Sequence, residues 1–132
     1  MMKQTAGILG LTGVALGAFG AHGLKSLLAT HGTAETWHTA VLYHLIHAVA
    51  MLALAAFAQN LTADAQRSKW LTFSARAWLC GVILFSGSLY AIALGAPKWL
   101  GAFITPAGGV AFLLGWAGLL CRERGSRGQS SP

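Results

Sequence analysis

Four long apolar runs are the feature that most restricts how this chain can fold. They cover about residues 4–24, 37–60, 75–96 and 103–121. At a rise of about 1.5 Å per residue, each run is long enough for an α-helix to cross a hydrocarbon core of roughly 30 Å. Lipid offers no partners to backbone N–H and C=O groups, so a single segment within it must be helical. The sequence therefore predicts an all-α membrane protein, a bundle of four transmembrane helices.

The composition agrees with a protein that has lipid as its solvent. Apolar residues make up 55% of the 132 residues and charged residues only 9%, whereas soluble domains carry roughly a quarter charged residues. A water-soluble fold with so little charge would leave a large apolar surface bare. The first run also resembles a signal peptide, with Lys3 in its basic part. Cleavage would release a product that is itself nearly all membrane-embedded, so we expect a retained helix.

The basic residues predict how the helices are oriented, because Lys and Arg near helix ends are retained in the cytoplasm. Only Lys25 and Lys98 fall on one predicted side of the membrane. The other side collects Lys3, Arg67, Lys69, Arg76, Arg122, Arg124 and Arg127. We therefore expect an N-in, C-in protein of the inner (plasma) membrane, with the linkers 25–36 and 97–102 outside.

The ends of the runs define the predicted domain. Residues 1–121 form a single transmembrane domain in this prediction, and 122–132 form a disordered cytoplasmic tail rich in Arg, Gly and Ser. Indole rings near helix ends can sit among lipid headgroups. We expect this of Trp37, Trp70, Trp78 and Trp99.

Small residues predict how the helices pack. In the first run Gly13, Gly17 and Ala21 recur every four residues, which leaves one helix face without large side chains. A neighbouring helix can then approach the backbone closely. Further small residues follow in the third and fourth runs, at Gly81, Ser86, Gly87, Ser88, Gly108, Gly109, Gly115 and Gly118. We expect these faces to pack against other helices of the bundle, against other membrane proteins or against a second copy of the chain, while the protein as a whole contacts the lipid bilayer.

The histidines of the second run are the residues best suited to binding chemistry. His44 and His47 stand three apart and share a helix face, whereas His38 points roughly the opposite way. Imidazole inside a bilayer is costly unless it is paired, and it can ligate a metal or bind a quinone headgroup. The candidate cofactor-binding residues are His44, His47, Tyr43, Ser86, Ser88 and Tyr90. A structural interpretation is that each imidazole forms a hydrogen bond across the bundle and fixes helix register.

Enzymatic motifs are missing from the sequence. The predicted helix cores contain no Asp or Glu, and no GxSxG, P-loop or HExxH motif occurs. Cys80 and Cys121 form no CxxC pair, so no zinc site is predicted. The formal charge of +6 is dispersed over loops and ends, so nucleic-acid binding is not supported. No catalytic residue and no metal site are predicted, and the identity of any cofactor stays unknown.

Four motifs make the chain resemble a known family, the small YgdD-type inner-membrane proteins of bacteria, which have mitochondrial relatives. The motifs are the segments 17–24, 37–48, 84–90 and 105–116, and Ala107 is small where a larger apolar residue is expected. The resemblance covers nearly the whole chain in order. It implies a membrane-embedded protein, and it supplies no activity, substrate or cofactor.

Two hypotheses for the function follow. The first is a non-enzymatic structural or accessory membrane protein whose small faces bind other helices. The second is a module that binds a small molecule or cofactor (a quinone, a haem or a metal) through the histidines of the second helix. A small transporter or channel is less well supported, because buried carboxylates and an evident inverted repeat are both missing.

Overall fold

The computed structural model describes residues 1–61 and 69–120, and every regular element in these two ranges is helical. The elements are α1 (Met2–Ala21), α2 (Lys25–His31), α3 (Ala34–Gln59), α5 (Lys69–Gly81), the π-helical turn η1 (Val82–Ser86), α6 (Gly87–Ala93) and α7 (Trp99–Leu120). Since α5, η1 and α6 follow one another without a break, these two ranges contain four helices long and apolar enough to cross a membrane. The predicted all-α, four-helix transmembrane fold is confirmed.

The observed helix ends differ from the predicted ends by a few residues. The third membrane helix begins at Lys69 rather than near residue 75, because its first turns are amphipathic and fall outside the apolar run. The fourth begins at Trp99 instead of residue 103. The predicted tail 122–132 and part of the segment between the second and third predicted runs lie outside the described residues.

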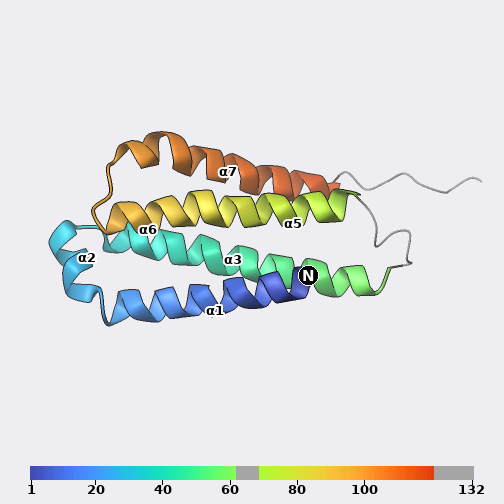
Figure 1. Ribbon diagram of the computed structural model, residues 1–132, viewed down its shortest axis with the longest axis horizontal. Helices are drawn as coiled ribbons and strands as arrows, with labels where there is room; N and C mark the ends of the chain where they lie inside the picture. Colours follow the sequence, from blue (N-terminus) through green and yellow to red (C-terminus); the bar gives the residue numbers. More distant parts are fainter. Residues whose placement is uncertain (62–68, 121–132) are drawn as a thin grey trace, which may run out of the picture.

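The four long helices lie side by side with nearly parallel axes, as Figure 1 shows. α1 packs against α3 as one antiparallel hairpin, and α5, η1 and α6 pack against α7 as a second. The two hairpins meet where α3 packs against α5, η1 and α6. α3 is therefore the central helix, while α1 and α7 are the outer ones and leave large apolar side chains exposed, such as Leu11 and Leu113. These surfaces contact the lipid bilayer.

A short helix, α2, occupies the linker between α1 and α3, where the sequence predicted only a loop. It ends at Gly32, whose positive φ of 65° lets its N–H bond to the carbonyls of Leu28 and Ala29. The Thr33 hydroxyl then donates to the carbonyl of Ala93, at 2.9 Å. This bond ties the start of α3 to the end of α6.

The interface between α1 and α3 is built on the predicted glycine face. A Cβ atom at Gly13 would lie 2.6 Å from Leu45 Cδ2, and one at Gly17 would lie 3.3 Å from Val41 Cγ1. Gly13 and Gly17 therefore face α3, as predicted. The third predicted member, Ala21, is exposed. Gly20 takes its place, because the ring of Trp37 occupies the space where its Cβ would stand.

At the interface between α5 and α7, each helix packs a large aromatic ring against a glycine of the other helix. The ring of Phe112 on α7 covers Gly81, and the indole of Trp78 on α5 covers Gly115. A Cβ at Gly118 would lie 2.5 Å from the hydroxyl of Ser74. Since apolar attraction between helices is weak in lipid, this close van der Waals packing is what holds the second hairpin together.

The π-helical turn η1 lies where α7 comes closest to its neighbour. A Cβ at Gly108 would collide with the backbone nitrogen of Phe85, so the two backbones touch here. Pro106 precedes this contact and lies inside α7. Proline has no N–H to offer the carbonyl four residues earlier, and α7 bends over its first turns (Figure 1).

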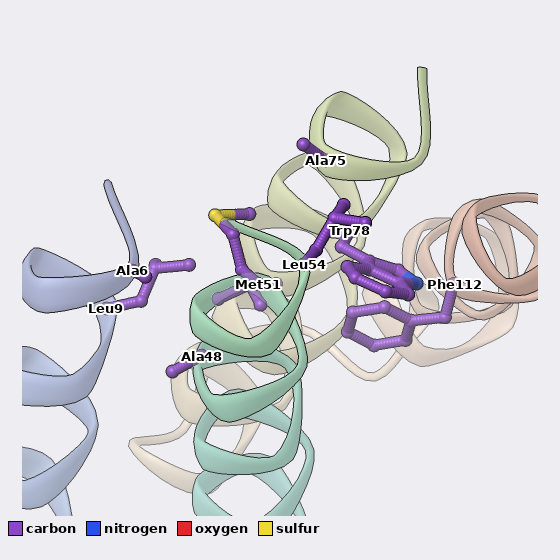
Figure 2. Packing of buried hydrophobic residues seen from close by; sticks show 9 residues of the cluster. Ala6, Leu9, Ala48, Met51, Leu54, Ala75, Trp78 and Phe112 are labelled. Carbon is purple, nitrogen blue, oxygen red and sulfur yellow. The ribbon is translucent and has the colours of Figure 1, made fainter. Parts of the chain in front are cut away.

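The larger core cluster joins all four membrane helices. Its side chains come from α1, from the second half of α3, from α5 with η1, and from α7, as Figure 2 shows: Ala6, Leu9, Ala48, Met51, Leu54, Ala75, Trp78, Val82 and Phe112. A smaller cluster consists of Leu28, Trp37 and Ala93. Trp37 and Trp78 are 5% and 1% exposed. The prediction that these two indoles sit among headgroups is therefore wrong, because neighbouring glycines make room for them inside the protein.

Candidate functional site

Two buried histidines on the central helix form the candidate site. His44 and His47 are 5% and 3% exposed, and both lie midway along α3. They stand one helical turn apart, as the sequence predicted, but their rings contact different neighbours. His44 lies between α1 and α6, and His47 lies against α7.

His44 links three helices through its two ring nitrogens. Nε2 lies 3.3 Å from the Thr12 hydroxyl on α1, and Nδ1 lies 3.3 Å from the Tyr90 hydroxyl on α6. Thr12 already donates its hydroxyl hydrogen to the carbonyl of Ile8, at 2.8 Å. Nε2 must therefore donate to Thr12, and Nδ1 accepts from Tyr90. The bonds run in one direction, from Tyr90 through His44 and Thr12 to the α1 backbone.

His47 adopts the opposite arrangement. Its Nδ1 lies 2.8 Å from the backbone carbonyl of Tyr43, and a carbonyl can only accept, so Nδ1 carries the hydrogen. Its Nε2 accepts from the indole N–H of Trp116 on α7, at 3.2 Å. The ring also stacks on Phe112, with centroids 3.6 Å apart and planes 11° apart. Both imidazoles are neutral in this network.

Aromatic rings enclose His47 on the side of α7. Tyr43 stacks on Phe85 and Phe112, with centroid distances of 4.6 and 5.9 Å. Trp78 and Trp116 lie 4.7 Å apart and both approach the His47 ring. Offset and tilted aromatic pairs of this kind add stability beyond the area they bury. The site is therefore a packed aromatic cluster around one imidazole.

The two lone pairs available to a ligand are those of His44 Nδ1 and His47 Nε2. A metal or haem iron binds through such a lone pair, and here the Tyr90 hydroxyl and the Trp116 indole occupy them. Within the residues that the structure describes, no group of three or more His, Cys, Asp or Glu side chains could hold a metal ion. Ligation by either imidazole would require the displacement of a partner from another helix.

The six predicted site residues do not form one cluster. Tyr90 joins His44, and Tyr43 stacks beside His47 on the same helix. Ser88 instead donates to the carbonyl of Phe85 at 2.9 Å and lies 2.7 Å from the hydroxyl of Thr105, which ties α6 to α7. The sixth residue, Ser86, is fully buried, and its hydroxyl has no partner among the described residues.

Five side chains of the site were not predicted from the sequence: Thr12, Trp78, Phe85, Phe112 and Trp116. Thr12 is the one hydroxyl midway along the first apolar run, and that position was the available signal. Phe112 and Trp116 are four residues apart on α7, so they share a face. Both rings contact His47 on α3, while Gly108 and Gly115 on the same helix contact Phe85 and Trp78 on the third membrane helix.

The other histidines lie away from this site. His22 and His38 are exposed, and no hydrogen bond involves their side chains in the described part of the chain. His31 Nδ1 lies 3.4 Å from the carbonyl of Ala93, beside the bond that Thr33 makes to the same oxygen. His22 and His38 are therefore not part of the candidate site.

Comparison with known proteins places these features in a family. A family described as "Protein of unknown function (DUF423)" matches residues 16–109. The chain is 41% identical over 84 residues to the UPF0382 membrane protein YwdK of Bacillus subtilis, which is 62% of this chain and 63% of the relative. It is 44% identical over 82 residues to the UPF0382 inner membrane protein YgdD of Escherichia coli K12, which is 62% of this chain and 58% of the relative. No solved structure shows a significant match.

A relative from Haemophilus influenzae, also described as a UPF0382 membrane protein, is 42% identical over 81 residues. The match spans 61% of this chain and 60% of that relative. In all three cases the chain thus covers less than two thirds of the relative's own length. The residues of the candidate site from His44 to Thr105 fall within the segment that the family model matches.

Proposed function

The chain belongs to the DUF423 family and is a multi-pass inner-membrane protein, and on this premise we propose that it is a non-enzymatic structural or accessory protein. One observation carries the proposal: all four ring nitrogens of His44 and His47 already have partners within the chain itself. The polar groups best suited to chemistry are thus used to connect helices.

These hydrogen bonds suit a scaffold. They join the central helix α3 to α1, α6 and α7, so a single helix sets the register of its three neighbours. In lipid, hydrogen bonds between helices are worth roughly 1 kcal/mol each. A frame held in this way keeps a constant outer shape, which an accessory protein needs if it is to present a surface to another helix.

The partner surface that we propose is the open side of α1. A Cβ atom at Gly7 or at Gly10 would have nothing within 4 Å. Gly7 is exposed, and Gly10 is half-buried at the edge of the interface that Gly13, Gly17 and Gly20 form with α3. A face of small residues in lipid allows a second helix to approach closely. The occupant in this proposal is a helix of another membrane protein or of a second copy of the chain.

The proposal is tested in two steps, the first on protein purified gently from its native membrane and the second in intact cells. First, the optical spectrum and metal content are measured; we expect no Soret band and no stoichiometric metal. A bound haem, metal or quinone that is lost in His47→Gln but kept in His31→Gln would overturn the non-enzymatic, scaffold assignment and favour cofactor binding.

Second, a photo-crosslinking amino acid is placed at Gly10, with Leu113 on the outer face of α7 as the control. Leu113 is 70% exposed and contacts lipid. We expect a discrete protein adduct from position 10 and none from position 113. If both positions give only lipid adducts in intact cells, the open side of α1 is not a partner surface.

A further inference from the structure

Arg76 is a charged residue in an unusual position on the third membrane helix. The side of α5 that faces the protein carries Ser74, Trp78 and Gly81. Arg76 follows Ser74 by two residues, which places it roughly 200° around the helix. It is exposed, and so it faces lipid.

Arg76 also lies inside the membrane rather than at its edge. The span Lys69–Ala93 has 25 residues and is therefore about 37 Å long. If a hydrocarbon core of roughly 30 Å is centred on it, the Cα of Arg76 lies about 7 Å below the core surface. A charge at this depth is costly unless it finds a partner. No ion pair involves Arg76 in the part of the chain that the structure describes.

The direction of the Arg76 side chain lowers the cost of this charge. In an α-helix the Cα–Cβ bonds tilt toward the N-terminal end, which for α5 is the near membrane surface. The long Arg side chain can therefore extend along the helix and bring its guanidinium to the headgroup region. On this path it meets Thr72 and Lys69, which are also exposed. The three residues stand at spacings of three and four and share one helix face.

We propose that Lys69, Thr72 and Arg76 bind the phosphate of an anionic phospholipid. A guanidinium offers two parallel N–H donors to phosphate oxygens, and an ammonium and a hydroxyl add one donor each. Two positive charges favour a headgroup with net negative charge over a zwitterionic one, whose own ammonium they repel. This inference does not depend on the proposed function, because the outer face of α5 is far from both imidazoles and from the open side of α1.

Two exposed rings next to the basic residues fit the same ligand. Trp70 and Phe73 are each 41% exposed and meet edge to face, with centroids 6.1 Å apart. An indole near the membrane surface sits among headgroups and glycerol groups. The pair thus offers an apolar wall beside the phosphate donors, where the upper acyl chain can lie. A free phosphate ion would make no use of this wall.

The experiment counts lipids bound to the purified full chain by native mass spectrometry. Phosphatidylglycerol and phosphatidylcholine are added in equal amounts to the wild type, Arg76→Gln, Lys69→Gln and Lys98→Gln. The last variant removes the same charge at the other end of the bundle and is the matched control. We expect phosphatidylglycerol to be retained by the wild type and by Lys98→Gln, and its binding to fall about five-fold for each charge removed at position 69 or 76.

The Arg76→Lys variant distinguishes the effect of the positive charge from that of the guanidinium geometry. It also serves as a control for loss of binding through misfolding. It keeps the charge and loses the two parallel donors, so we expect binding between that of the wild type and that of Arg76→Gln. The proposal is overturned if Arg76→Gln binds phosphatidylglycerol as the wild type does, or if Lys98→Gln loses as much. Displacement of the bound lipid by excess inorganic phosphate would likewise show a phosphate site rather than a lipid site.

Discussion

At the scale of single residues, the two imidazoles carry their hydrogens on different nitrogens. The ring hydrogen of His44 is on Nε2 and that of His47 is on Nδ1. In each case the hydrogen-bond partner can only accept, because the Thr12 hydroxyl already donates elsewhere and the Tyr43 carbonyl has no hydrogen. The partner of His47 at Nδ1 is a carbonyl, and its partner at Nε2 is an indole N–H. Neither choice follows from the sequence alone, because Thr12, Tyr90 and Trp116 come from three other helices.

These hydrogen positions are directly measurable. Solid-state NMR of the ¹⁵N-labelled protein in lipid should show His47 protonated at Nδ1 and His44 protonated at Nε2, both neutral at pH 7. Substitution of Trp116 by Phe should shift the Nε2 resonance of His47 and leave His44 unchanged. A charged His47, or the same tautomer at both positions, would contradict the network described above.

The bond between His47 and Trp116 should contribute measurably to stability. In a double-mutant cycle of His47→Leu and Trp116→Phe, we expect a coupling of about 1 kcal/mol in the free energy of unfolding, measured in mixed detergent. Each single variant leaves one polar group without its partner in an apolar environment, which is the cause of the coupling. The pair His38→Leu and Trp116→Phe is the control and should show none. A coupling near zero for both pairs would mean that the hydrogen bond does not fix α3 against α7.

At the scale of helices, the closest approach is that of α7 to the π-helical turn η1. A methyl group at Gly108 would meet the backbone of Phe85, which cannot move aside as a side chain can. We therefore expect Gly108→Ala to destabilise the protein by about 1–3 kcal/mol. The matched control is Gly10→Ala, where open space receives the methyl group and the intrinsic preference of Ala for helix acts alone. Thermal unfolding in detergent distinguishes the two; equal melting temperatures would show that α7 is not seated against η1.

The sequence predicts the membrane helices well and their local irregularities poorly. Length and apolarity are sufficient for the four spans, and a spacing of four residues is sufficient for the packing of Gly13 and Gly17. The turn η1 was not predicted; it lies where Gly108 of another helix approaches the backbone of Phe85. The burial of Trp37 likewise depends on Gly20, which leaves room for its ring. The sequence pattern of a single helix does not predict features that depend on contacts with another helix.

At the scale of the whole molecule, charge divides between the two ends of the bundle. Lys3, Lys69 and Arg76 lie toward one end, where α1 and α5 begin; Lys25 and Lys98 lie toward the other, where α2 lies and α7 begins (Figure 1). The Lys3 ammonium donates to the Gln59 side chain at 2.8 Å, so the start of α1 is held beside the end of α3. The orientation that we propose, with both termini in the cytoplasm, puts the more basic end inside.

Cysteine labelling tests this orientation. Cys80 and Cys121 are first replaced by Ala, and a single cysteine is then placed at Ser26 on α2 or at Asn60 after α3. Both positions are exposed. A membrane-impermeant maleimide added to intact cells should label position 26 and spare position 60 until the membrane is opened. The reverse pattern would invert the proposed orientation, and labelling of both positions from outside would contradict the membrane span α3.

The location of the protein could be predicted from its sequence, and its candidate site could be predicted only in part. Four apolar runs and four motifs indicated a member of an inner-membrane family. Of the six predicted site residues, however, Tyr43 and Tyr90 lie beside the two imidazoles, Ser88 contacts Thr105, and the Ser86 hydroxyl has no partner among the described residues. Periodicity shows that His44 and His47 share a face, but which side chains fill the space opposite them depends on how α1, α6 and α7 are seated.

The pairing of α1 with α3 and of α5–α6 with α7 has a consequence for biogenesis. Each hairpin has its own glycine-mediated interface. The translocon can therefore insert the two hairpins one after the other, and the hairpins can associate in the membrane afterwards. A gene split between the codons for Leu61 and Lys69 should therefore still yield two inserted fragments that copurify. Gly13→Leu should abolish the pairing of α1 with α3 inside the first fragment without preventing insertion of the second. Failure of the intact halves to associate would mean that insertion has to be continuous for the two pairs to meet.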